Sequence, residues 1–146
     1  IGRFHALRRI WPTTMKVVVD SSAILSILFA EPDSDEILIA INENECAISA
    51  GNYLETAIVV DSTKDPVAIR KFNALIKEGG IEILSVDSKQ VDVARAAYRD
   101  YGKGTGHPAR LNYGDVFAYA LAATTRRKLI CKGGDFLETD IAIFDL

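Results

Sequence analysis

Long apolar segments and cysteine are both scarce in this 146-residue sequence. No apolar run reaches the roughly 18–20 residues that a membrane-spanning helix needs. The two cysteines, Cys46 and Cys131, are far apart, and neither belongs to a CxxC pair. A metal site built on only these two cysteines and the two histidines of the chain is not expected. We therefore expect reduced thiols in a cytoplasmic protein, with no membrane segment.

Low-complexity tracts, internal repeats and interdomain linkers are also missing. Apolar residues make up 49% of the chain and charged residues 25%, which is close to the globular average and excludes collagen and disordered classes. Residues 1–14 show no clear periodicity, whereas Met15 opens the run MKVVVDSSAI. We expect 1–14 to be a non-native or unstructured extension and 15–146 to form one domain.

The charge of the expected domain bears on its partners. Residues 1–14 contain three arginines and no acid, so removing them from the formal net charge of −3 leaves −6 for the remainder. An acidic protein does not attract nucleic acid as a whole. Any such binding must use a local basic patch.

Apolar periodicity predicts strands that alternate with helices along the whole chain. The run KVVV is typical of a strand buried on both faces. The predicted strands are 16–19, 46–49, 81–86, 129–131 and 141–144, and the predicted helices are 22–30, 34–41, 50–60, 66–76, 88–101 and 112–125. This order predicts an α/β fold with a parallel sheet and helices on both faces.

Four carboxylates occupy informative places in this pattern. Asp20 directly follows the first strand, Glu55 leans toward the apolar face of its helix, Asp115 lies in the first turn of a helix, and Asp135 follows the Gly133-Gly134 turn. Each has an ordinary structural explanation, such as a helix cap, a solvated helix residue, a dipole-stabilised first turn or a loop turn. Asp140 is a further acid five residues beyond Asp135.

The convergence of these acids is the more specific interpretation. Ligands of open α/β sheets bind beyond the carboxyl ends of the strands, where three of the four acids are expected. Several carboxylates repel one another unless a cation neutralises them, and an oxygen-only set suits Mg²⁺ or Mn²⁺. Such a site suits phosphoryl-transfer chemistry with an activated water.

Basic residues lie near two of the acids. Lys103 and Arg110 belong to the glycine-rich loop before Asp115, and Lys132 precedes Asp135. Solvated surface charge is the default explanation. Contacts to RNA phosphates beside an acidic site are the sharper one.

Four segments, in this order, resemble the PIN-domain ribonucleases, and specifically the VapC toxins of VapBC modules. They are VVVDSSAI (17–24), SAGNYLETAIVV (49–60), HPARLNYGDVFAYALA (107–122) and CKGGDFLETDI (131–141). The resemblance runs from about Met15 to the C-terminus. The combination is specific, although VVVD alone would mean little.

The resemblance implies a PIN fold, a three-layer α/β/α sandwich around a short parallel sheet. It implies Mg²⁺- or Mn²⁺-dependent cleavage of RNA, a homodimer, and a cognate VapB-like antitoxin that blocks the site. The family's acids correspond to Asp20, Glu55, Asp115 and, in fourth place, Asp135, with Asp140 as the alternative. They are the implied catalytic and metal-binding residues.

Two details accompany this correspondence. Ser22 matches the family's hydroxyl after the first Asp and is implied to position that carboxylate or a phosphate. Many members carry Asn or Asp where Gly134 stands, which leaves the fourth acidic position open between Asp135 and Asp140.

Two alternatives use the same residues differently. A receiver-type signalling module would have paired acids near the end of its first strand, but Asp20 has no acidic neighbour, and only Lys132 supports this hypothesis. A PIN fold that lost its activity and acts as a scaffold is the other. The presence of all four acids argues against it.

Overall fold

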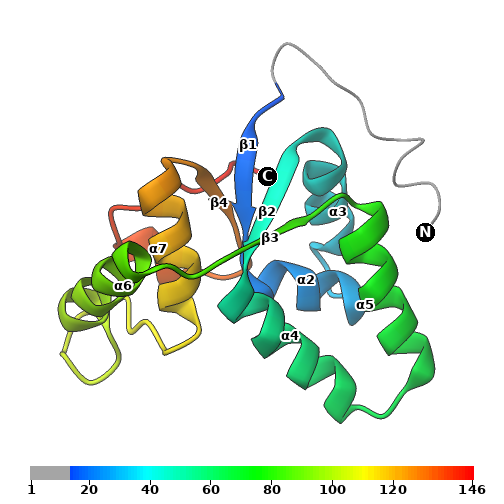
Figure 1. Ribbon diagram of the computed structural model, residues 1–146, viewed down its shortest axis with the longest axis horizontal. Helices are drawn as coiled ribbons and strands as arrows, with labels where there is room; N and C mark the ends of the chain where they lie inside the picture. Colours follow the sequence, from blue (N-terminus) through cyan, green and yellow to red (C-terminus); the bar gives the residue numbers. More distant parts are fainter. Residues whose placement is uncertain (1–13) are drawn as a thin grey trace.

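The computed structural model describes residues 14–146, in which parallel strands form one central sheet (Figure 1). The expected extension, apart from Thr14, lies outside the described residues. The strands are β1 (Lys16–Val19), β2 (Glu45–Ser49), β3 (Glu82–Leu84) and β4 (Lys128–Ile130), and the sheet order is β3-β2-β1-β4. All neighbouring strands run parallel, so their carboxyl ends lie at one edge. The predicted parallel sheet is confirmed.

Helices cover both faces of the sheet (Figure 1). Their bounds are α2 (Ser21–Leu28), α3 (Ser34–Glu43), α4 (Ala50–Ser62), α5 (Pro66–Glu78), α6 (Ser88–Tyr101) and α7 (Asp115–Thr125), followed by the short 3-10 helix η1 (Asp135–Glu138). The first layer holds α2 to α5 and the third holds α6 and α7. Within the described chain, no helix is long and apolar enough to span a membrane.

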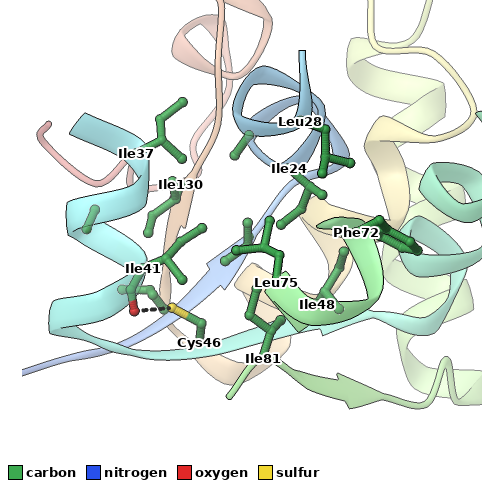
Figure 2. Packing of buried hydrophobic residues seen from close by; sticks show 14 of the residues in the cluster. Ile24, Leu28, Ile37, Ile41, Cys46, Ile48, Phe72, Leu75, Ile81 and Ile130 are labelled. Carbon is green, nitrogen blue, oxygen red and sulfur yellow. Dashed lines mark hydrogen bonds between the residues drawn. The ribbon is translucent and has the colours of Figure 1, made fainter. Parts of the chain in front are cut away.

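The alternation of side chains along β1 explains the two layers. Val17 and Val19 pack into a cluster with α2, α3 and α5, whereas Val18 faces α6 and α7. Figure 2 shows the first cluster, in which Ile24 and Ile41 are fully buried. Each such side chain contributes about 1.5–3 kcal/mol through burial. The sheet is therefore fixed from both sides, and the ends of its strands are held rigidly.

Two of the expected strands differ in the structure from the sequence analysis. The strand expected at 81–86 is confined to Glu82–Leu84. The strand expected at 141–144 is wrong as a strand, because only one bridge, Leu129 to Ile143, pairs this segment with β4. The strand β4 is itself three residues long, and Leu129 alone makes both backbone hydrogen bonds to the segment.

The start of α7 also differs from the expectation. The helix begins at Asp115 instead of just after Asn112. The two residues exchange hydrogen bonds: the backbone N–H of Asp115 donates to Asn112 Oδ1, and the backbone N–H of Asn112 donates to Asp115 Oδ2, both at 2.9 Å. This reciprocal pair resembles a capping box. Asn112 therefore still caps the start of α7, although the two intervening residues form a turn.

Candidate functional site

Asp20 lies at the carboxyl end of β1, one of the two inner strands of the sheet. Its backbone N–H donates to Ile130 O at 2.9 Å, which ties it to the end of β4. Its carboxylate is only 4% exposed and caps α2 by accepting hydrogen bonds from Ser22 N at 3.1 Å and Ser22 Oγ at 2.6 Å. Burial raises the pKa of Asp20, and the carboxylate of Glu55 acts in the same direction, whereas the bonds from Ser22 oppose the shift. Asp20 therefore caps α2 and also belongs to the acidic cluster.

Ser22 makes a second contact that places β4 against this carboxylate. Its Oγ accepts a hydrogen bond from the backbone N–H of Lys132 at 2.9 Å while donating to Asp20. The hydroxyl expected to position Asp20 therefore bonds it in the structure.

Glu55 reaches the same region from α4, which starts directly after β2. The hydroxyl of Ser21 donates to Glu55 Oε1 at 2.7 Å. The carboxylate lies against the backbone at Gly114, where a Cβ atom would be closer to Oε2 than real Cβ contacts allow. Glycine at this position thus permits α4 to pack its acid against the start of α7.

Asp115 opens α7 and is half-buried. Burial raises its pKa to about 6, with further contributions from the negative charges of Asp20, Asp135 and Glu55, against the hydrogen bond from Asn112. Each of the other three acids is thus close enough to act on Asp115. The structure brings together all four of the acids expected at the first to fourth positions.

Asp135 and Asp140, the two candidates for the fourth acid, have different surroundings. Asp135 is the exposed first residue of η1, after Gly133 with a left-handed φ of 89°. Asp140 instead accepts a hydrogen bond from Tyr119 Oη at 2.5 Å, and this bond, after burial, raises the pKa of the phenol. Asp135 acts electrostatically on the cluster, whereas Asp140 has a partner of its own.

The thiol of Cys131 lies close enough to the acids for their negative charges to affect its pKa. The thiol is buried, and burial raises its pKa to about 12, assisted by the charges of Asp20, Asp115 and Asp135. A thiol of this kind stays protonated at neutral pH and is a poor nucleophile. We assign it no chemical role.

Basic side chains do not neutralise the cluster. Among residues 14–146, the ion pairs of lysine and arginine join Arg99 to Asp100, and Lys132 to Glu31 and Asp33. None involves the four clustered acids. Within residues 14–146 the carboxylates thus have no cationic partner, although one of them is almost fully buried, and such an arrangement favours an external cation.

The donor set fits a hard divalent cation. Carboxylate and hydroxyl oxygens are the ligands that Mg²⁺ and Mn²⁺ prefer, and the single nearby sulfur is held protonated. In the described part of the chain, however, no group of three or more His, Cys, Asp or Glu side chains is arranged so that it could hold a metal ion. The chemistry of the donors fits a cation, whereas their present arrangement does not form a metal site.

The basic candidates lie in different environments. Lys103 and Arg110 are exposed, and Arg110 adopts a left-handed φ of 51°. The ammonium group of Lys132 contacts Glu31 and lies 3.6 Å from Asp33 Oδ1. The hydrogen bond to Glu31 is the largest cause of its raised pKa. Lys132 thus ties the end of β4 to the segment between α2 and α3.

Ser21 was missed by the sequence analysis. The structure shows it bonded to Glu55, an acid 34 positions away. The available signal was a second hydroxyl beside Asp20, and its partner depends on how α4 packs.

Comparison with known proteins gives a family match over most of the chain. The model of the family described as PIN domain matches residues 17–142. Ribonuclease VapC28 of Mycobacterium tuberculosis is 44% identical over 126 residues, covering 86% of this chain and 95% of the relative. Ribonuclease VapC42 of the same species is 40% identical over 126 residues, covering 86% and 96%.

Solved structures share the fold at low sequence identity. VapBC2 from Rickettsia felis, bound to a promoter DNA fragment, superposes with a TM-score of 0.69 and 14% identity, covering 90% of this chain and 98% of the other. A toxin–antitoxin complex from Klebsiella pneumoniae gives 0.68 and 15%, covering 88% and 96%. The receiver-type alternative is therefore wrong. The sheet, the acids and the sequence match all agree that the chain belongs to the PIN-domain family.

Proposed function

We propose that this protein is a metal-dependent endoribonuclease and the toxin of a toxin–antitoxin pair. The observation that carries the proposal is the cluster of Asp20, Glu55, Asp115 and Asp135, which act on one another electrostatically and have no basic partner in the described chain. Relatives that share 40–44% of their residues with the chain are named ribonucleases.

We propose for the acids the roles that their correspondence with the PIN-domain ribonucleases implies. Asp20 and Asp115 are the proposed direct ligands of Mg²⁺ or Mn²⁺, and Glu55 and Asp135 complete the pocket. A bound cation of this kind supplies Lewis-acid chemistry, polarising a phosphodiester and increasing the acidity of a water. Ser22 holds the Asp20 carboxylate in place through its 2.6 Å hydrogen bond, and this fixed orientation reduces the rearrangement needed on binding.

Substrate contacts are proposed at exposed basic residues. Lys103 and Arg110 form no ion pair within residues 14–146 and lie on the loop that leads to Asp115. They can therefore contact RNA phosphates without breaking an existing bond. Lys132, the third candidate, would first have to leave Glu31 and Asp33.

Protein partners are proposed from the neighbours and from an apolar face. The Rickettsia felis and Klebsiella pneumoniae structures are a VapBC assembly and a toxin–antitoxin complex, and we infer a VapB-like antitoxin and a homodimer here. A hollow of about 340 Å³ beside Glu55 is lined by Leu54, Ile58 and Phe117, and the first two are 60% and 56% exposed. Exposed apolar surface of this kind favours protein contacts.

RNA cleavage by the purified chain tests the proposal. Several RNAs, including structured tRNA, are tested, and we expect cleavage with Mg²⁺ or Mn²⁺ and none in EDTA. Asp115→Asn should abolish cleavage while keeping the fold, because it removes a ligand charge with little change in volume. Full activity of this variant, or of the wild type in EDTA, would refute the metal site. Intact RNA with folded wild-type protein and metal present would support the inactive-scaffold alternative.

A further inference from the structure

Asn52 connects two of the segments that carry acids. It lies on α4 and is 0% exposed. Its Nδ2 donates to Gly114 O at 2.8 Å and lies 3.4 Å from Glu55 Oε1 as a second acceptor. One amide group carries two protons, so both acceptors can be served at once. Gly114 directly precedes Asp115.

Burying the amide group of Asn52 lowers the stability of the fold, which indicates a role beyond packing. Asn52 Oδ1 is buried and has no hydrogen-bond partner in the described chain. A buried acceptor without a partner destabilises a fold, and an apolar side chain of similar volume would fill the same space without that cost. Asn52 nevertheless spans the contact between α4 and α7, where its two donor bonds meet the candidate site.

Glu55 is held from two directions by this arrangement. Ser21 Oγ donates to Glu55 Oε1 at 2.7 Å from the start of α2, and Asn52 approaches the same oxygen from within α4. Within residues 14–146, no hydrogen bond reaches the other oxygen, Oε2. One oxygen is therefore held by hydrogen bonds, whereas the second packs against the backbone of Gly114.

We propose that Asn52 is a positioning residue that sets the separation between the carboxylates of Glu55 and Asp115. The proposal rests on the proposed metal-dependent function of this cluster. Asn52 fixes one acid directly and the other through the backbone of Gly114. Its loss lets the start of α7 and the Glu55 side chain move independently, which weakens cation binding and turnover but leaves the RNA-contacting loop in place.

Asn52→Ala tests this role, and Asn42→Ala is a matched control. Asn42 is also a buried asparagine with an unpartnered Oδ1, but it lies on α3, near the amino end of β2 and away from the acids. The measurements are the Mn²⁺ dissociation constant of the metal-free protein by titration calorimetry, the kcat and KM for RNA, and the melting temperature.

We expect Asn52→Ala to weaken Mn²⁺ binding and lower kcat by about tenfold or more, as for residues that orient metal ligands, with KM changed less than about twofold. Asn42→Ala should lower the melting temperature without changing either constant. Asn52→Leu, which keeps the branching and the number of side-chain heavy atoms but has no donor, should behave as Asn52→Ala even if the alanine variant folds poorly.

A double-mutant comparison separates positioning from general destabilisation. In a Glu55→Gln background, removing Asn52 should cost clearly less than it does in the wild type, because one of its two acceptors has already lost its charge. Unchanged Mn²⁺ affinity in both Asn52 variants would overturn the proposal, as would an undiminished loss in the Glu55→Gln background. If the wild type binds Mn²⁺ but cleaves no RNA, the nuclease proposal fails while the Mn²⁺ titrations still decide the role of Asn52.

Discussion

Replacing Asp115 by Asn should stabilise the metal-free protein at neutral pH. The pKa of this carboxyl is about 6 in the folded chain instead of the ordinary 3.8. A raised folded-state pKa means that the folded state binds the proton more tightly, so stability falls as the pH rises from about 4 through 6. Asn cannot ionise and avoids that loss, and its amide oxygen can still accept the bond from Asn112.

The magnitude follows from the size of the pKa difference. A rise from 3.8 to about 6 corresponds to about 3 kcal/mol for a fully buried group. Asp115 is only half-buried, and solvent screening reduces the gain expected from the substitution to about 1–2 kcal/mol. For a domain of this size the melting temperature should rise by roughly 3–8 °C.

Thermal melts in EDTA at pH 7.5 and below pH 4 measure this effect, with the exposed Asp92→Asn on α6 as the control. The gain should appear for Asp115→Asn at pH 7.5 and disappear below pH 4, where the wild-type carboxyl is protonated in both states. Added Mn²⁺ should raise the melting temperature of the wild type more than that of the variant. A lower melting temperature for Asp115→Asn in EDTA at pH 7.5 would refute the convergence of the acids, as would a gain that persists at low pH.

Three further outcomes are expected in the cleavage assay. Ser21→Ala should reduce kcat by about tenfold, because it removes a hydrogen bond to the charged Glu55 whose loss costs about 1.5–3 kcal/mol; activity equal to wild type would contradict this. Asp135→Asn should lose most activity and Asp140→Asn should keep it, since only Asp135 acts on the cluster; the reverse result would exchange their roles. Arg110→Ala should weaken RNA binding and reduce the slope of log affinity against log salt by about one, and an unchanged slope would exclude a phosphate contact.

Local sequence patterns predicted the parts of the fold that depend on near neighbours. The run KVVV specified a buried strand, and the acid that follows it had to lie at the strand's carboxyl end, where Asp20 is found. The helix expected at 88–101 has those bounds because Asp87 caps its start and Gly102 follows its end. The strand expected at 141–144 was wrong, because an unbroken apolar run such as IAIF indicates a strand even where the neighbouring strand pairs with it through a single residue.

The assembly of the site depends on contacts that no local pattern specifies. Whether Glu55 faces solvent or the acids is decided by the packing of α4 on α7, and in its present position the Glu55 carboxylate occupies the space that a Cβ atom at Gly114 would take. The partners of Lys132 lie about a hundred positions earlier in the chain, so its ion pairs could not be read from the charges around it. Charge spacing in the sequence located the basic residues, but only the fold shows which of them are engaged.

Two acids of the site make local hydrogen bonds that would, by themselves, explain them as structural residues. Asp20 caps α2, and Asp115 takes part in the capping pair at the start of α7, so each has a local partner that would justify it alone. Neither bond cancels the cost of burial, since both carboxyls keep raised pKa values. Local capping would be served as well by Ser or Asn, which carry no charge. The charges that remain after capping destabilise the metal-free fold, and the proposed cation site accounts for their presence.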